Sequence, residues 1–118
     1  MFPGAVESAW HQHSNGGGWV ENTATVTATA FVGPDALVYD TAVVRGNAVV
    51  RDNAVVRGNA AVCDTALVCD TALVCGNAAV YGNAVVYGNA AVCGTARVCD
   101  NAVVRDTALV CDNAVVSK

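Results

Sequence analysis

The sequence carries little charge, few aromatic side chains and no long apolar run. Of its 118 residues, 14% are charged and 6% are aromatic, whereas 54% are apolar. A chain with this much apolar surface can bury a core, so we do not expect disorder. A membrane-spanning helix needs about 20 mostly apolar residues, and the regular polar interruptions of this chain leave no room for one. The net charge of −4 argues against nucleic acid as a partner.

Histidine is scarce, and the start of the chain does not look like a leader sequence. Both of the two histidines lie near the start, and residues 1–10 contain no basic region followed by an apolar run. We therefore expect no secretory signal. Six cysteines in a chain without such a signal favour reduced thiols. The length suits one domain, and we expect a cytoplasmic protein that binds neither nucleic acid nor membrane.

The sequence is rich in one feature, a repeat of six residues. Alanine recurs at every sixth position from Ala24 to Ala114, and valine does so from Val20 to Val116. Sixteen units of the form Ala-x-Val plus three corner residues fill residues 21–116. In a short strand, the alanine and valine side chains point to one side and the x side chain points to the other. Gly or Asp followed by Asn or Thr is typical of a sharp bend. The pattern predicts an all-β parallel β-helix shaped as a triangular prism, with three units per coil and about five coils.

Two other architectures fit the repeat less well. An alanine-rich helix has a period of about 3.6 rather than six, and it would not tolerate frequent valine with a regular Gly or Asp. Amyloid-like stacking of separate segments is the second alternative, against which the non-repeating start argues. We interpret residues 1–19 as an N-terminal cap and residues 20–118 as the β-helix. The glycine run 16–18 would allow a sharp turn into the first strand. The aromatic side chains expected to cover the open core are Phe2, Trp10 and Trp19.

The repeated motif resembles that of a known superfamily. Ala-x-Val-x-Gly/Asp-Asn/Thr is similar to the hexapeptide repeat of left-handed parallel β-helix proteins, familiar from bacterial acyltransferases and γ-class carbonic anhydrases. The opening His-Ser-Asn-Gly-Gly-Gly-Trp-Val of residues 13–20 resembles YdcK-like hexapeptide proteins, which are described as transferases of unknown activity. The resemblance covers residues 10–116 and implies a left-handed coil. Those enzymes need histidines on the coils and usually an extruded loop. This chain has neither, so no catalytic residue can be assigned.

With three units per coil, each residue is expected to lie beside the residue eighteen positions later, so the outward x residues form three columns. The mixed column is Thr25, Val43, Ala61, Ala79, Arg97 and Val115. The two apolar columns are Phe31, Val49, Leu67, Val85 and Val103, and then Leu37, Val55, Leu73, Ala91 and Leu109. A soluble monomer rarely exposes a contiguous apolar patch of this kind, so the two columns either pack against other copies or remain an apolar surface between charged corners. Asn and Thr before each Ala form further columns, in which stacked side chains can hydrogen-bond.

We expect the protein to be a structural module that assembles with itself and has no catalytic site of its own. The repeats run to Val116 without a second cap, and an uncovered coil is a template for another chain. The expected partner is a further copy of the chain, in a dimer or filament, through the apolar columns and the C-terminal Val115 and Val116. The alternative is a transferase-like protein with an inter-subunit site that uses His11 or His13.

Few residues are candidates for chemistry, and we expect no cofactor. Cys75, Cys93 and Cys111 share one edge, where the spacing would permit a disulfide or attract a soft metal. We interpret them as small corner residues in a reducing cell, because no second kind of ligand lies nearby. His11 and His13 are weak metal candidates, and we expect both to be solvent-exposed residues of the cap. The x columns also lack the regular threonine array that an ice-binding face would need.

Overall fold

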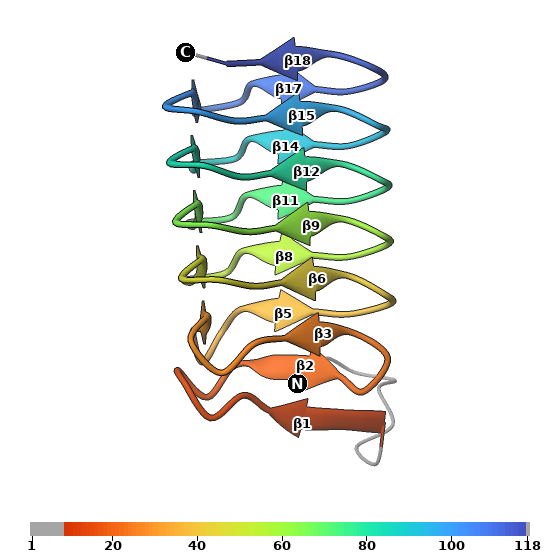
Figure 1. Ribbon diagram of the computed structural model, residues 1–118, viewed down its shortest axis with the longest axis vertical. Coiled ribbons are helices and arrows are strands. Elements are labelled where there is room, and N and C mark those ends of the chain that lie inside the picture. Colours follow the sequence, from red (N-terminus) through yellow and green to blue (C-terminus); the bar gives the residue numbers. More distant parts are fainter. Residues whose placement is uncertain (1–8, 118) are drawn as a thin grey trace.

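Short strands recur at six-residue intervals, from β2 (Trp19–Glu21) to β18 (Val115–Val116), in a computed structural model that describes residues 9–117 (Figure 1). Each strand is followed by a corner, and the chain winds upward through stacked coils. The six-residue period therefore sets the length of each side of the coil. Among the described residues, no helix is long and apolar enough to cross a membrane.

Every third strand belongs to the same sheet, so the strands form three sheets. Sheet A comprises β1 (Trp10–Gln12), β2, β5 (Leu37–Val38), β8 (Val55–Val56), β11 (Leu73–Val74), β14 (Ala91–Val92) and β17 (Leu109–Val110). Sheet B comprises β3 (Thr25–Val26), β6 (Val43–Val44), β9 (Ala61–Val62), β12 (Ala79–Val80), β15 (Arg97–Val98) and β18. Sheet C comprises β4 (Phe31–Val32), β7 (Val49–Val50), β10 (Leu67–Val68), β13 (Val85–Val86) and β16 (Val103–Val104).

The strands are parallel from β2 onward, and each residue lies beside the residue eighteen positions later. Leu67 pairs with Val85, for example, and Val85 pairs with Val103. The predicted all-β parallel β-helix is therefore confirmed, with three sheets that fit its three predicted sides. Register cannot slip, because a shift of one residue would turn every buried side chain to the solvent.

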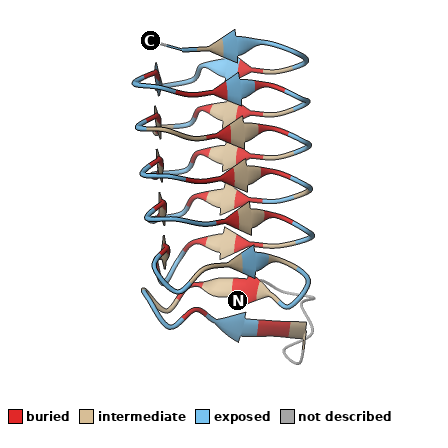
Figure 2. Ribbon diagram, viewed as in Figure 1, coloured by how far each residue is buried: buried red, intermediate tan, exposed pale blue. Residues whose placement is uncertain are grey.

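The interior is filled by alanine and valine alone along the repeats. Ala60 and Val62 are 0% exposed, while Ala61 between them points outward and is half-buried. Figure 2 shows this alternation on coil after coil. Small alanine directly before the strand and β-branched valine on the strand fill the narrow cross-section of the coil without a polar side chain. Among the described residues, His13 is the one polar residue that is buried.

The corners explain why Gly or Asp recurs. Both occupy the left-handed backbone region at this position, as at Asp64 with φ 62° and Gly82 with φ 69°. Aspartate adds a second contribution, because the Gly82 N–H donates to Asp64 Oδ2 at 3.0 Å in the coil below. The predicted Asn and Thr ladders are confirmed as well. Thr65 donates to the side-chain oxygen of Asn83, which in turn donates to Asn101.

The N-terminal segment covers two of the three sheets at their first strand. β1 runs antiparallel to β2, and Trp10 is 8% exposed with its ring 5.8 Å from that of Tyr39. Residues 13–18 bind β4 instead, since Gly18 N–H donates to Val32 O at 2.9 Å and Val32 N–H donates to Asn15 O at 3.1 Å. A Cβ at Gly18 would lie only 2.2 Å from a backbone oxygen of Gly33, so this close approach requires glycine.

The expectation that Trp19 covers the core is wrong. Trp19 pairs with Leu37 and is half-buried, whereas its neighbour Val20 is 0% exposed. The strand alternation already begins at β2, so Trp19 occupies the first outward position of sheet A and Val20 the first inward one. Phe2 lies outside the described residues.

Candidate functional site

The predicted outward columns occur as neighbouring residues of the three sheets. Sheet C presents Phe31, Val49, Leu67, Val85 and Val103 in register. Sheet A presents Leu37, Val55, Leu73, Ala91 and Leu109, with Trp19 preceding them. Both columns consist of apolar side chains from the first coil to the last. The two faces are therefore continuous apolar strips along the stack.

Exposure along these strips is not uniform. In the inner coils the outward residues are half-buried, because the same residue of the next coil covers part of each side chain. Val103 is 50% exposed, and Leu109 and Val115 are each 64% exposed (Figure 2). Core positions also open in this last coil, where Ala108 and Ala114 are exposed. The largest uncovered apolar side chains of the described residues thus gather at the C-terminal coil.

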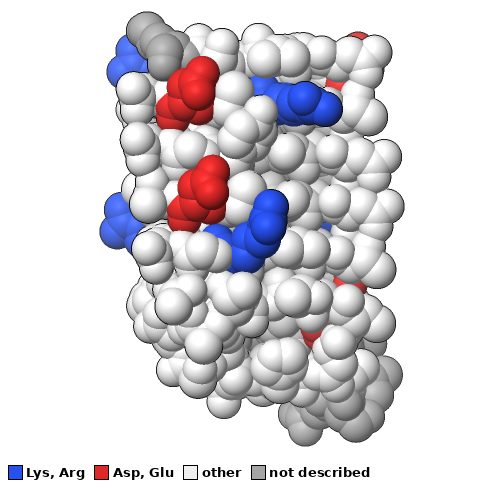
Figure 3. Space-filling view, in the orientation of Figure 1, with Lys and Arg blue, Asp and Glu red and all other residues white. Residues whose placement is uncertain are grey.

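Sheet B differs from the other two sheets by its polar outward residues. Figure 3 shows one face of the molecule, on which a few charged side chains stand over an otherwise uncharged surface. An open hollow of about 420 Å³ lies on sheet B. It is lined by Arg45, Ala61, Cys63, Asp64, Ala79, Tyr81 and Arg97. Sequence reasoning missed the hollow. Its signal was the pair of small alanines, Ala61 and Ala79, at successive x positions of sheet B, with Arg97 after them in the same column and Arg45 at a neighbouring corner.

The two histidines do not form a metal pair. His13 is only 6% exposed, and its Nε2–H donates to the Ala30 carbonyl at 2.7 Å. His11 is exposed and donates from Nδ1 to Asn22 Oδ1 at 2.7 Å. The expectation that both histidines are solvent-exposed is therefore wrong for His13, because the loop 13–18 folds it against the end of the core. The two imidazole rings therefore hydrogen-bond to different residues, Asn22 and Ala30.

The predicted cysteine ladder is present on one edge of the stack. Cys75, Cys93 and Cys111 follow β11, β14 and β17, which are neighbours in sheet A. Burial raises the pKa of the Cys93 thiol, and the adjacent Cys75 thiol raises this pKa further. Burial, Asp112 and Cys93 likewise raise the pKa of Cys111. The raised pKa values of Cys93 and Cys111 favour the protonated form of these two thiols. All three cysteines of the ladder are free.

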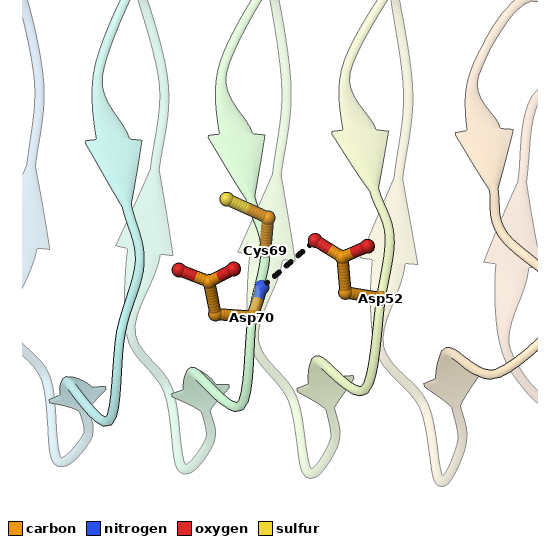
Figure 4. Close-up of side chains that lie close together, drawn as sticks. All are labelled: Asp52, Cys69 and Asp70. Carbon is orange, nitrogen blue, oxygen red and sulfur yellow. Dashed lines mark hydrogen bonds between the residues drawn. The ribbon is translucent and has the colours of Figure 1, made fainter.

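A second cluster joins two carboxylates and a thiol. The potential ligand atoms of Asp52, Cys69 and Asp70 lie within 4.8 Å of one another (Figure 4). Each carboxylate, however, already accepts a backbone N–H of the next coil. Asp70 N–H donates to Asp52 Oδ2 at 3.3 Å, and Gly88 N–H donates to Asp70 Oδ2 at 3.0 Å. These contacts make the cluster a consequence of corner packing. Sequence reasoning missed it because the pattern does not give side-chain directions.

The geometry described above is not matched by known proteins in any of three comparisons. No protein-family model, no curated protein and no solved structure matches this chain.

Proposed function

We propose that this protein is a structural module without its own catalytic site, which assembles with further copies of the same chain. The observation that carries the proposal is the pair of apolar strips on sheets A and C, which become most exposed at Val103 and Leu109. Contiguous apolar surface of this kind is typical of protein–protein contacts. The contact surface includes the strips themselves and the last coil with Val115 and Val116.

A second copy suits the strips because it supplies the same six-residue geometry. Its own sheets A and C present apolar residues at the same interval along the stack, as Leu67, Val85 and Val103 do in sheet C. Two strips can therefore lie against each other over several coils.

The membership of the left-handed hexapeptide-repeat superfamily is part of this proposal and rests on the repeated motif. A transferase-like inter-subunit site, the alternative, would depend on His11 or His13. His13 is engaged with the Ala30 carbonyl and buried. Only His11 of the two offers an exposed imidazole. The contacts of the two histidines therefore favour the structural function over the enzymatic one.

A double substitution of the apolar strips tests the proposal. Val103→Glu combined with Leu109→Glu should weaken assembly at least about tenfold, because two carboxylates would have to be desolvated in the contact. Both side chains are at least half-exposed, so the fold should tolerate the change. Light scattering over a dilution series should give the unaltered chain a mass of at least twice 11.9 kDa at micromolar concentration, and the variant a mass near 11.9 kDa.

The matched control places the same charge on exposed corner residues of inner coils, outside both the strips and the last coil. Asn47 and Asn53 are such residues, and Asn47→Glu with Asn53→Glu should leave the mass of the assembly unchanged. Equal loss of assembly in both variants would show that charge repulsion, and not the apolar strips, governs the mass. An unaltered chain that stays at 11.9 kDa at every concentration would contradict the proposal as a whole.

A further inference from the structure

We propose that Cys75, Cys93 and Cys111 form a binding site for a soft, thiophilic cation in linear two-coordination, the class that includes Cu(I). The ion binds either between Cys75 and Cys93 or between Cys93 and Cys111, so the central Cys93 is a ligand in both arrangements. The inference goes beyond the proposed function and does not depend on assembly, because all three thiols come from one chain.

The three cysteines are held at neighbouring positions by the backbone ladder. Cys75 N–H donates to Val92 O at 2.9 Å, and Cys93 N–H donates to Val110 O at 2.9 Å, so the residues follow one another in adjacent coils. Both neighbours also act on the pKa of the Cys93 thiol, which Cys75 raises and Cys111 lowers. The ligands are thus positioned before any ion binds, which lowers the entropic cost of binding.

The spacing of the ladder selects the coordination geometry. Adjacent parallel strands lie about 4.8 Å apart. A metal–thiolate bond is about 2.3 Å long, so an ion centred between two thiolates in a line spans about 4.6 Å. The three ladder thiols are not all within reach of one ion. Among the described residues, the three-residue group whose potential ligand atoms all lie within 4.8 Å of one another is Asp52, Cys69 and Asp70. A linear pair therefore fits, and a trigonal or tetrahedral set does not.

The chemistry of the ligands excludes most other ions. Thiolates select soft cations, whereas Mg²⁺ and Ca²⁺ require oxygen ligands. Structural Zn²⁺ needs four ligands, and the ladder offers two thiols to any one ion. On binding, each of the two thiols releases its proton to solvent, and the bis-thiolate complex of a monovalent cation carries one negative charge. Arg57 stands one coil before Cys75 on the same edge and can offset that charge.

The other three cysteines of the chain provide an internal comparison. Cys63, Cys69 and Cys99 are 8%, 5% and 7% exposed, whereas the ladder thiols are all partly exposed. Cys63 and Cys99 share an edge but are separated by Tyr81 in the coil between them, and Cys69 has no cysteine neighbour on its edge. These three thiols cannot pair at one strand spacing. The ladder thus differs from them in both accessibility and pairing.

Titration with Cu(I) under anaerobic conditions, in competition with the chromogenic chelator bicinchoninate, tests the site. The unaltered chain should withdraw one Cu(I) per chain. Cys75→Ser and Cys111→Ser each leave one adjacent pair, so each variant should still bind one Cu(I), with affinity reduced about twofold. Cys93→Ser leaves two thiols separated by two strand spacings, about 9.6 Å, and should lose at least about a hundredfold in affinity.

The control is the chain in which Cys63, Cys69 and Cys99 are all replaced by serine, which should bind Cu(I) as the unaltered chain does. Serine already occupies the equivalent corner position at Ser117, and unchanged far-ultraviolet circular dichroism should show that the variants fold. Binding by Cys93→Ser with unaltered affinity would overturn the proposal. A control variant that loses Cu(I) as completely as Cys93→Ser would overturn it as well, because binding would then depend on cysteine number and not on the ladder.

Discussion

Val62→Asp should unfold the chain under conditions in which Ala61→Asp leaves it folded. Val62 is 0% exposed in the apolar interior, and no polar side chain of the repeats lies there to pair with a carboxylate. An unpaired buried charge costs at least about 4 kcal/mol, which is a large part of the roughly 5–15 kcal/mol that stabilises a typical domain. Ala61 is the preceding residue of the same strand but points outward, so the same carboxylate there should cost less than about 1 kcal/mol.

Thermal unfolding followed by circular dichroism would measure the difference. Val62→Asp should either fail to fold or melt at least about 15 °C below the unaltered chain, while Ala61→Asp should melt within about 5 °C of it. Equal melting temperatures for the two variants would contradict the inward and outward assignment of neighbouring residues.

Gly76→Val should destabilise the protein strongly, although Gly76 is an exposed residue. Gly76 has φ 65°, a region in which a β-branched side chain is strained, and a Cβ there would lie 2.9 Å from backbone atoms of Gly94. The strain and the contact together should cost about 2–4 kcal/mol. Urea unfolding should show a correspondingly lower midpoint for the variant, although its mutated residue is a corner residue and not part of the core.

Gly76→Asp is the matched control for this corner. Asp64 and Asp70 already occupy the equivalent position with φ 62° and 61°, and each accepts a backbone N–H from the next coil. An aspartate at position 76 would have the same Cβ contact, but it is not β-branched and should accept the Gly94 N–H in the same way, so it should cost at least about 1 kcal/mol less than valine. If valine and aspartate proved equally destabilising, the backbone conformation would not be the reason for glycine at the corners.

The repeat period made most of the fold predictable. Because the period never slips, the neighbour of each residue in the next coil follows by adding eighteen, and the pairing of Leu67 with Val85 confirms this. Alternation along each strand then fixed which residues point inward. The confirmed columns needed no information beyond these two regularities.

The non-repeating start was less predictable, because it has no period to follow. His13 is buried by the path of a six-residue loop and by one contact to the Ala30 carbonyl, neither of which a sequence pattern records. Trp19 was assigned to the cap because the composition of residues 1–19 differs from that of the repeats. It already follows the inward and outward alternation of the strands, however, and pairs with Leu37. The carboxylate contacts of Asp52 and Asp70 also depend on side-chain directions, which periodicity does not determine.

The pairing of each residue with the one eighteen positions later has a consequence for how such a chain can change its length. Each coil contacts the coil before it and the coil after it, so duplication or deletion of eighteen residues within the repeats preserves the register of every remaining pair. An insertion of six residues would instead rotate all following residues by one side of the coil and place the sheet C column above a different face. Growth by whole coils is therefore nearly neutral for the fold, and the apolar strips lengthen by one residue with each added coil.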